Sequence, residues 1–177
     1  YGGNAAMMHY HATPEDHAVL EKKGFLLVDS GATYMDGTTD ITRTYPLGPL
    51  TEDEKRFYTW TLQSHIDLAK AVWLDYCECK MIDTIAREPL WRHLINYRCG
   101  TGHSVSFVGN VHEGPHALNS RNTTRMRPGM VVTDEPGVYE TDLVGIRIEN
   151  ELGCVHKADN QYGTFLAFRP LTFVPIA

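Results

Sequence analysis

The chain has 177 residues, of which 42% are hydrophobic and 21% charged, and its formal net charge is -6. This length and composition are typical of one globular domain with its own core. The negative charge disfavours a nucleic acid or an anionic membrane as partner, and no apolar run approaches the roughly 20 residues of a membrane helix. Four scattered cysteines predict reduced thiols in a cytoplasmic protein rather than a disulfide framework: Cys77, Cys79, Cys99 and Cys154.

The first part of the chain predicts extended structure. Residues 1–10 are expected to form a strand that begins with a turn at residues 2–4. Residues 25–29 and 34–43 predict a β-hairpin, because two β-rich runs flank a turn that contains Gly37. The first of these runs is apolar and ends at Asp29, which predicts a buried strand that delivers a carboxylate to an interior site.

Two helices are expected next. Thr51 and Glu54 form the sequence pattern of a capping box, and apolar residues at helical spacing follow until the pattern fades near Leu74. Residues 81–95 predict a second helix. Its Pro89 is expected at a break rather than in the middle, because proline cannot donate a helical hydrogen bond.

The second half of the chain predicts loops and short strands. Glycine-rich loop begins near Tyr97, strands are expected at residues 130–133, 145–149 and 152–155, and the final segment 164–176 is expected to be a strand. No repeat or linker interrupts the sequence. The chain is therefore expected to form one domain, residues 1–177, of mixed α and β structure.

Five potential metal ligands lie on these short strand-like segments. An aspartate at a strand end is usually a turn former or cap, but one that ends a buried apolar run would be costly to leave uncompensated. One histidine among four carboxylates suits a pair of divalent ions bridged by shared carboxylates, as in two-metal hydrolysis. The five residues are Asp29, Asp40, His103, Glu135 and Glu149.

Three longer motifs occur in the same part of the sequence: DGTTDITRT at residues 36–44, NVHEGP at 110–115 and GIRIEN at 145–150. With the five potential ligands, in this order, they resemble the catalytic domain of the aminopeptidase P, Xaa-Pro dipeptidase and creatinase family of "pita-bread" metallopeptidases. The resemblance is closest to the aminopeptidase P branch. It implies an α+β pita-bread fold, with a curved antiparallel sheet and covering helices. It also implies that the chain is a partial catalytic domain that lacks the upstream N-terminal domain.

The resemblance implies a role for each potential ligand. Asp29 would bind one ion, Asp40 and Glu149 would bridge two ions, and His103 and Glu135 would complete the other. Two divalent ions per chain are expected, with manganese favoured and zinc or cobalt also suited.

Further residues gain roles from the same resemblance. His112 would hydrogen-bond the scissile carbonyl or the developing oxyanion, and His9 would contact the substrate near the proline. Glu135 would pass a proton to the leaving nitrogen. Arg147, two residues before Glu149, would contact substrate or orient a metal-binding carboxylate. His11, His17 and His116 are expected to be loop histidines, and Tyr139 an ordinary strand aromatic.

Two positions depart from the family pattern. Cys99 stands where the family commonly has a substrate-contacting histidine, and Ser104 stands where it has a glycine. Neither change removes a metal ligand, so both bear on rate and specificity.

The leading interpretation is a metal-dependent hydrolase that removes the N-terminal residue from peptides with proline in second position, by attack of a metal-bridging hydroxide. The alternatives are an Xaa-Pro dipeptidase and a catalytically silent pita-bread domain that binds peptides or proteins. Relatives are often dimers, so a homodimer is also an open alternative. The expected partners are thus peptides with a penultimate proline, and neither nucleic acid nor membrane.

Overall fold

A computed structural model describes residues 1–176 of the chain. A short 3-10 helix, η1 (Gly2–Ala6), is followed by the hairpin strands β1 (Phe25–Tyr34) and β2 (Gly37–Pro46). The helices α1 (Glu52–Ala69) and α2 (Cys79–Trp91) flank a short strand, β3 (Val72–Leu74). The remaining strands are β4 (Gly102–Ser104), β5 (Glu113–Leu118), β6 (Val131–Asp134), β7 (Gly137–Glu140), β8 (Val144–Arg147), β9 (Asn150–Asn160) and β10 (Gly163–Pro170).

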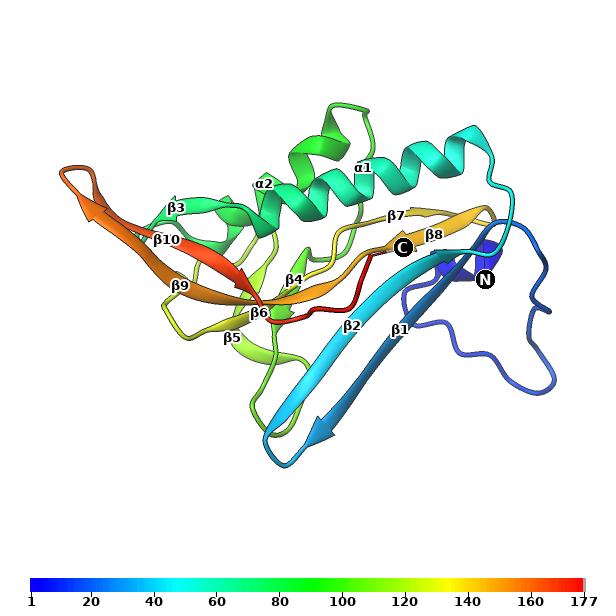
Figure 1. The fold of residues 1–177 in the computed structure, drawn as a ribbon, viewed down its shortest axis with the longest axis horizontal. Helices are drawn as coiled ribbons and strands as arrows, with labels where there is room; N and C mark the ends of the chain where they lie inside the picture. Colours follow the sequence, from blue (N-terminus) through cyan, green and yellow to red (C-terminus); the bar gives the residue numbers. More distant parts are fainter. Residues whose placement is uncertain (177) are drawn as a thin grey trace.

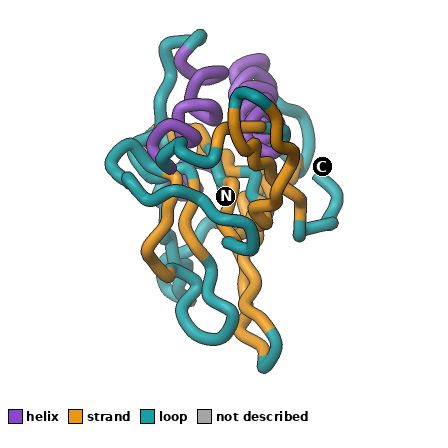
Figure 2. The backbone as a smooth tube through the Cα atoms, turned by 90° about the vertical axis from the view of Figure 1, so that its left-hand side faces the viewer, coloured by secondary structure: helices purple, strands orange, loops and turns teal. Residues whose placement is uncertain are grey.

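Six of the strands form one sheet in the order β3-β10-β9-β6-β4-β5, and each neighbouring pair is antiparallel. The pairs β1-β2 and β7-β8 are separate two-stranded ribbons. Both helices lie on one side of the six-stranded sheet, whereas the β1-β2 hairpin extends away from the helices (Figure 1). Figure 2 shows the same layers from the side, with the helices at the top and the hairpin pointing down.

The main core lies between the helices and the six-stranded sheet. Side chains from both helices and from strands β5, β6, β9 and β10 pack there, and burial of this apolar surface is the main force that holds the layers together. Its members include Leu68, Ile82, Ala86, Leu118, Val132, Leu152, Leu166 and Phe168. No helix of the described chain is long and apolar enough to cross a membrane.

Helix α1 begins as the sequence predicts. The Thr51 hydroxyl accepts a hydrogen bond from the Glu54 amide, and the Glu54 carboxylate accepts one from the Thr51 amide. The helix ends at Ala69 rather than near Leu74, because residues Val72–Leu74 pair with β10. Helix α2 spans Cys79–Trp91 rather than 81–95.

The expectation of a break at Pro89 was wrong, since this proline lies within α2. The helix ends two residues later, so the missing proline amide costs one hydrogen bond in a final turn that is closing in any case.

Three further expectations are corrected. Residues 1–10 contain the 3-10 helix η1 instead of a strand. Ala5 of this helix is buried against Gly145, and a side chain at position 145 would overlap the Ala5 carbonyl. Strand β1 is largely exposed instead of buried, since β2 is its one strand partner in the described chain, and the Asp29 side chain is 44% exposed. The last strand, expected over residues 164–176, ends at Pro170. Beyond it, the carbonyls of Val174 and Pro175 accept hydrogen bonds from Arg43.

Candidate metal centre

The β1-β2 hairpin brings two aspartates together. Asp29 pairs with Thr42 across the hairpin, and Asp40 lies two residues before Thr42, so all three side chains share one face. Gly31 stands opposite Asp40, and a Cβ at this position would overlap the carbonyl of Thr39. Glycine therefore allows the hairpin strands to approach closely beside the ligands.

The histidine comes from the six-stranded sheet. His103 is the middle residue of β4, and its Nε2 atom lies 3.2 Å from Glu135 Oε1 and 3.5 Å from Asp40 Oδ2. Glu135 follows the end of β6, which pairs with β4. The preceding glycine, Gly102, has no room for a Cβ because the Thr133 carbonyl occupies that space.

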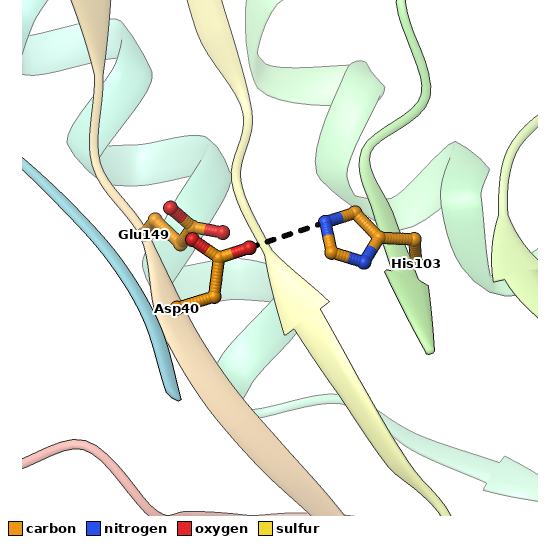
Figure 3. A group of neighbouring side chains, drawn as sticks. All are labelled: Asp40, His103 and Glu149. Atoms are coloured by element: carbon orange, nitrogen blue, oxygen red, sulfur yellow. Dashed lines mark ion pairs between the residues drawn. The ribbon is translucent and has the colours of Figure 1, made fainter. Parts of the chain in front are cut away.

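A third carboxylate completes a compact group. Glu149 lies between β8 and β9, and its side chain meets those of Asp40 and His103 (Figure 3). One ligand atom from each of these three residues lies within 4.8 Å of the others. The group thus joins the hairpin to the main sheet through residues that are distant in sequence.

Glu149 has an unusual environment for a carboxylate. Its side chain is buried, and its Oε2 atom accepts a hydrogen bond of 2.6 Å from the Thr42 hydroxyl. Its Oε1 atom has no hydrogen-bond partner among the described residues. Burial raises the pKa of Glu149, and the nearby charges of Glu135 and Asp40 raise it further. A buried, unpartnered oxygen beside other carboxylates is costly unless a cation binds it.

The pKa of His103 is raised as well, which for a histidine favours the charged form. Burial acts to lower the pKa of His103, but hydrogen bonds to Asp40 and Glu135 outweigh it and raise the pKa to about 10. In this state the protonated ring supplies positive charge to the carboxylates. A histidine that binds a metal must be neutral, so an ion would replace that proton. Three carboxylates and one imidazole are a donor set that fits a divalent ion.

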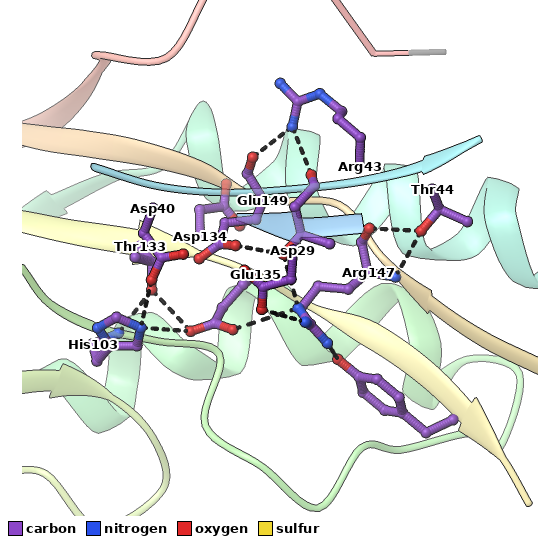
Figure 4. Close-up of polar contacts among 12 residues, drawn as sticks. Asp29, Asp40, Arg43, Thr44, His103, Thr133, Asp134, Glu135, Arg147 and Glu149 are labelled. Carbon is purple, nitrogen blue, oxygen red and sulfur yellow. Dashed lines mark hydrogen bonds and ion pairs between the residues drawn. The ribbon is translucent and has the colours of Figure 1, made fainter. Parts of the chain in front are cut away.

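Thr133 and Arg147 contact three of the potential ligands (Figure 4). The Thr133 hydroxyl accepts the His103 amide N–H at 3.0 Å and donates to Glu135 Oε1 at 3.0 Å. Arg147 Nη2 donates to Asp29 Oδ2 at 2.7 Å. Asp29 is therefore turned toward Arg147, and it lies outside the compact group of Asp40, His103 and Glu149.

Arg147 links both ends of this network. It is almost fully buried, its Nη1 donates to the Tyr139 hydroxyl at 3.1 Å, and its Nε lies 3.9 Å from Glu135 Oε2. Burial acts to lower the pKa of Arg147, but Tyr139 and the carboxylates of Asp29 and Glu135 raise it, so the guanidinium stays charged. Arg147 thus contacts the potential ligand Asp29, while its contact with substrate stays a prediction.

The two histidines expected at the substrate lie along one cleft. A cavity of about 540 Å³ is lined by His9 and His112 together with Asp29 and Asp40. The His112 ring meets the His103 ring edge to face at 4.1 Å. Their catalytic roles stay predictions, but both side chains border the space beside the ligands.

Cys99 lines a different cavity, of about 500 Å³, with Met8 and Tyr139 among its neighbours. Burial raises the pKa of the Cys99 thiol, which keeps it protonated near neutral pH. The expectation that His116 is a loop histidine was wrong: it lies in β5 and is buried. Its Nε2 atom lies 2.7 Å from the Val131 carbonyl.

Sequence reasoning missed several residues that support the ligands. Glu151 accepts the Asp40 amide N–H at 2.7 Å, Thr42 binds Glu149, and Thr133 binds His103 and Glu135. Each lies two residues from a potential ligand, the spacing that places two side chains on one face of an extended segment. That spacing was the available signal.

The sheet is antiparallel with both helices on one side, and one histidine is gathered with several carboxylates, as expected of a pita-bread fold with a metal centre. The chain belongs to metallopeptidase family M24, whose family model matches residues 1–155. The expected α+β pita-bread fold is thereby confirmed.

Within this family, the chain is similar to aminopeptidases that act on Xaa-Pro peptides by name. The chain is 42% identical over 181 residues to a probable Xaa-Pro aminopeptidase P of Laccaria bicolor, covering 99% of this chain and 28% of the relative. It is similar to the crystal structure of the X-prolyl aminopeptidase of Caenorhabditis elegans, described as a cytosolic enzyme with a di-nuclear active site. The TM-score is 0.92 at 37% identity, covering 99% of this chain and 29% of that one.

A prolidase of Pyrococcus furiosus is also similar, with a TM-score of 0.83 at 27% identity, covering 98% of this chain and 48% of that one. The chain thus spans less than a third of the aminopeptidase relatives' length.

Proposed function

We propose that this chain carries the metal centre of an aminopeptidase that removes the N-terminal residue from peptides with proline in second position. The observation that carries the proposal is the convergence of Asp40, His103 and Glu149, with one buried oxygen of Glu149 left unpartnered. The similarity to aminopeptidase P proteins over almost the whole chain supports the substrate class.

Two divalent ions would be held by Asp29, Asp40, His103, Glu135 and Glu149, with manganese favoured for so oxygen-rich a set. When bound, such ions lower the pKa of a water and withdraw charge from the scissile carbonyl. The di-nuclear active site named for the similar C. elegans enzyme supports the number of ions. The same similarity supports a cytosolic location.

The chain's own residues would position the substrate and move its proton. His112, at the edge of the cleft, would donate an N–H to the oxygen on which negative charge develops. Glu135 would pass a proton to the proline nitrogen as it leaves. Arg147 would keep Asp29 oriented through their ion pair of 2.7 Å. His9 would contact the substrate on the proline side.

The first experiment is metal content per chain, by elemental analysis after manganese loading and desalting, followed by a cleavage assay with Xaa-Pro peptides. We expect about two ions per chain and release of the first residue. An Asp40→Asn variant should retain fewer ions. Folded protein that retains no metal would refute the proposal.

Two alternatives have specific support. Similarity to a prolidase supports an Xaa-Pro dipeptidase, which would cleave a dipeptide but leave a longer peptide intact. Cys99, which cannot act as a cationic hydrogen-bond donor, supports a silent peptide-binding domain, which would bind metal and peptide without cleavage. The homodimer stays a prediction, and sedimentation would test it.

A further inference from the structure

His65 is a buried histidine that lies outside the candidate metal centre. It comes from the interior of α1, and its ring points at the six-stranded sheet. Its Nδ1 atom lies 3.2 Å from the carbonyl oxygen of Asp134 and 3.2 Å from Oδ2 of the same residue. Its Nε2 atom lies 3.2 Å from Asn150 Nδ2. One ring thus bridges a residue of β6 and a residue of β9.

The two bridged residues adjoin two potential metal ligands. Asp134 immediately precedes Glu135, and Asn150 immediately follows Glu149. Asp134 and Asn150 also face each other as the last pair of the β6-β9 ladder. Successive side chains of an extended segment alternate between its two faces, so this pair points toward α1, whereas Glu135 and Glu149 point toward the face where Asp40 lies.

The β6-β9 ladder of the described chain does not continue to the two ligands. The amide of Glu135 donates to the Thr101 carbonyl at 2.8 Å, and the amide of Glu149 donates to the Thr42 carbonyl at 3.1 Å. Hydrogen bonds between Glu135 and Glu149 therefore do not set the distance between their carboxylates. That distance depends on the preceding pair, which the His65 ring spans.

The hydrogen bonds around His65 run in one direction. Arg43 Nη2 donates to Asn150 Oδ1 at 2.7 Å, and a guanidinium can only donate, so the other polar atom of the Asn150 side chain is the NH2 group. That group donates to His65 Nε2, so the proton of the ring lies on Nδ1 and faces Asp134. A chain of polar contacts therefore runs from Arg43 through Asn150 and His65 to Asp134.

Asp134 depends on this proton. Its side chain is fully buried, and neither carboxylate oxygen has a hydrogen-bond partner among the described residues. In the same part of the chain, His65 Nδ1 is its one ion-pair partner. A buried carboxylate without such a partner is costly, so loss of the ring would favour movement of Asp134 toward water or another donor. Glu135 follows directly and would move with it.

His65 does not bind the metal itself. Among the described residues, the side chains whose ligand atoms converge are Asp40, His103 and Glu149. Any influence of His65 on the centre must therefore pass through the residues that it bridges.

We propose that His65 is a positioning residue of the metal centre: by bridging Asp134 and Asn150, it sets the spacing of Glu135 and Glu149. This inference rests on one part of the proposed function, that these carboxylates hold metal. It does not depend on which peptide is cleaved.

Three substitutions separate the two contacts of the ring. His65→Asn places an amide near the position of Nδ1, so it keeps a donor for Asp134 and loses the contact with Asn150. His65→Gln places an amide near the position of Nε2, so it keeps an acceptor for Asn150 and loses the donor for Asp134. His65→Phe keeps the volume of the ring and loses both contacts.

Manganese titration of the metal-free chain by calorimetry measures the effect. We expect His65→Phe to bind manganese about 10–100-fold more weakly than the wild type, the usual effect of losing a residue that orients a ligand. The Asn and Gln variants, which keep one contact each, should lose about 3–10-fold and remain measurable even if His65→Phe does not fold. The electron paramagnetic resonance spectrum of bound manganese should change from that of a coupled pair in the wild type to that of isolated ions in His65→Phe, because a displaced Glu135 would no longer complete the second ion.

His116→Phe is the matched control. His116 is also buried, and its ring contacts the Val131 carbonyl at 2.7 Å, but neither residue adjoins a potential ligand. This substitution should lower the urea midpoint and leave manganese affinity and the spectrum of the coupled pair unchanged. If His65 only anchors α1, its variants will behave in the same way: less stable, with unchanged manganese binding. That result would overturn the proposal.

Peptide cleavage separates this inference from the proposed function. If the wild type binds manganese and cleaves no Xaa-Pro peptide, weaker manganese binding in the His65 variants would support the inference, and the aminopeptidase would be refuted. If the wild type cleaves such peptides, wild-type manganese affinity in the variants would refute the inference and leave the aminopeptidase standing. A wild-type chain that binds no manganese would refute both.

Discussion

Thr133 offers the sharpest test of how the candidate centre is held together. Its hydroxyl contacts two potential ligands at once: it accepts from the His103 amide and donates to Glu135 Oε1, both at 3.0 Å. Thr133→Val keeps the shape of the side chain and removes both hydrogen bonds. The residue is fully buried, so no water replaces the lost hydroxyl.

The size of the effect follows from these contacts. A buried N–H that loses its acceptor costs about 1–3 kcal/mol, so we expect the free energy of unfolding to fall by about 2 kcal/mol. With a urea dependence of about 2 kcal/mol per molar, the unfolding midpoint should drop by about 1 M. Loss of an outer hydrogen bond to a ligand typically weakens metal binding about 10–100-fold, and we expect this for manganese.

Thr61 provides the matched control. It is also fully buried, but its hydroxyl has no partner in the described chain. Thr61→Val should therefore leave stability unchanged or slightly higher, and should leave manganese binding unchanged. The assays are urea unfolding of the metal-free chain and manganese titration by calorimetry. If Thr133→Val behaves like Thr61→Val in both assays, the assigned role of Thr133 is wrong.

Four further predictions concern the buried cysteines, Arg43 and Gly102. Burial raises the pKa of Cys79 and of Cys154 to about 11, so both thiols should resist iodoacetamide at pH 8 while the less buried Cys77 reacts, as mass spectrometry would show. In the unfolded chain the Cys79 thiol has the ordinary pKa of 9.0, so folding holds it protonated to a higher pH. The free energy of unfolding should therefore be unaffected by this thiol below pH 9 and should fall as the pH rises from 9 to about 11. Cys79→Ala should lack this fall in urea unfolding. Arg43→Lys should lower the free energy of unfolding by about 2–4 kcal/mol, because one ammonium cannot replace the contacts of the guanidinium with Asn150, Val174 and Pro175. Urea unfolding measures this, and a variant as stable as the wild type would contradict it. Gly102→Ala should prevent manganese retention, because its methyl group would overlap the Thr133 carbonyl beside His103; full metal content would show that the strands can separate.

Features encoded in a few neighbouring residues could be predicted from the sequence. The capping box of Thr51 and Glu54 depends on four consecutive residues, and the structure contains both of its hydrogen bonds. The β1-β2 hairpin likewise follows from two β-rich runs around one turn. The family motifs predicted the pita-bread fold because they carry information that composition and periodicity lack.

Features that depend on long-range pairing could not be predicted this way. The apolar run before Asp29 indicated a buried strand, but burial depends on whether other elements cover it, and β1 pairs with β2 alone in the described chain. The contacts of Glu151 with the Asp40 amide and of Thr42 with Glu149 span more than a hundred residues, so they depend on how the hairpin meets β9.

The separation of the hairpin from the main sheet has a consequence for folding. Asp29 and Asp40 belong to a ribbon that shares no strand ladder with the six-stranded sheet in the described chain, whereas His103 belongs to that sheet. Ions held between them would cross-link two independently hydrogen-bonded pieces. These ligands come together only when the hairpin meets the six-stranded sheet, so the unfolded chain would bind such ions weakly. Each tenfold rise in metal concentration above the dissociation constant would then add about 1.4 kcal/mol per ion to the free energy of unfolding. Amide hydrogen exchange in β1 and β2 should slow more than exchange in α1 when manganese is added, so the hairpin would report on metal occupancy.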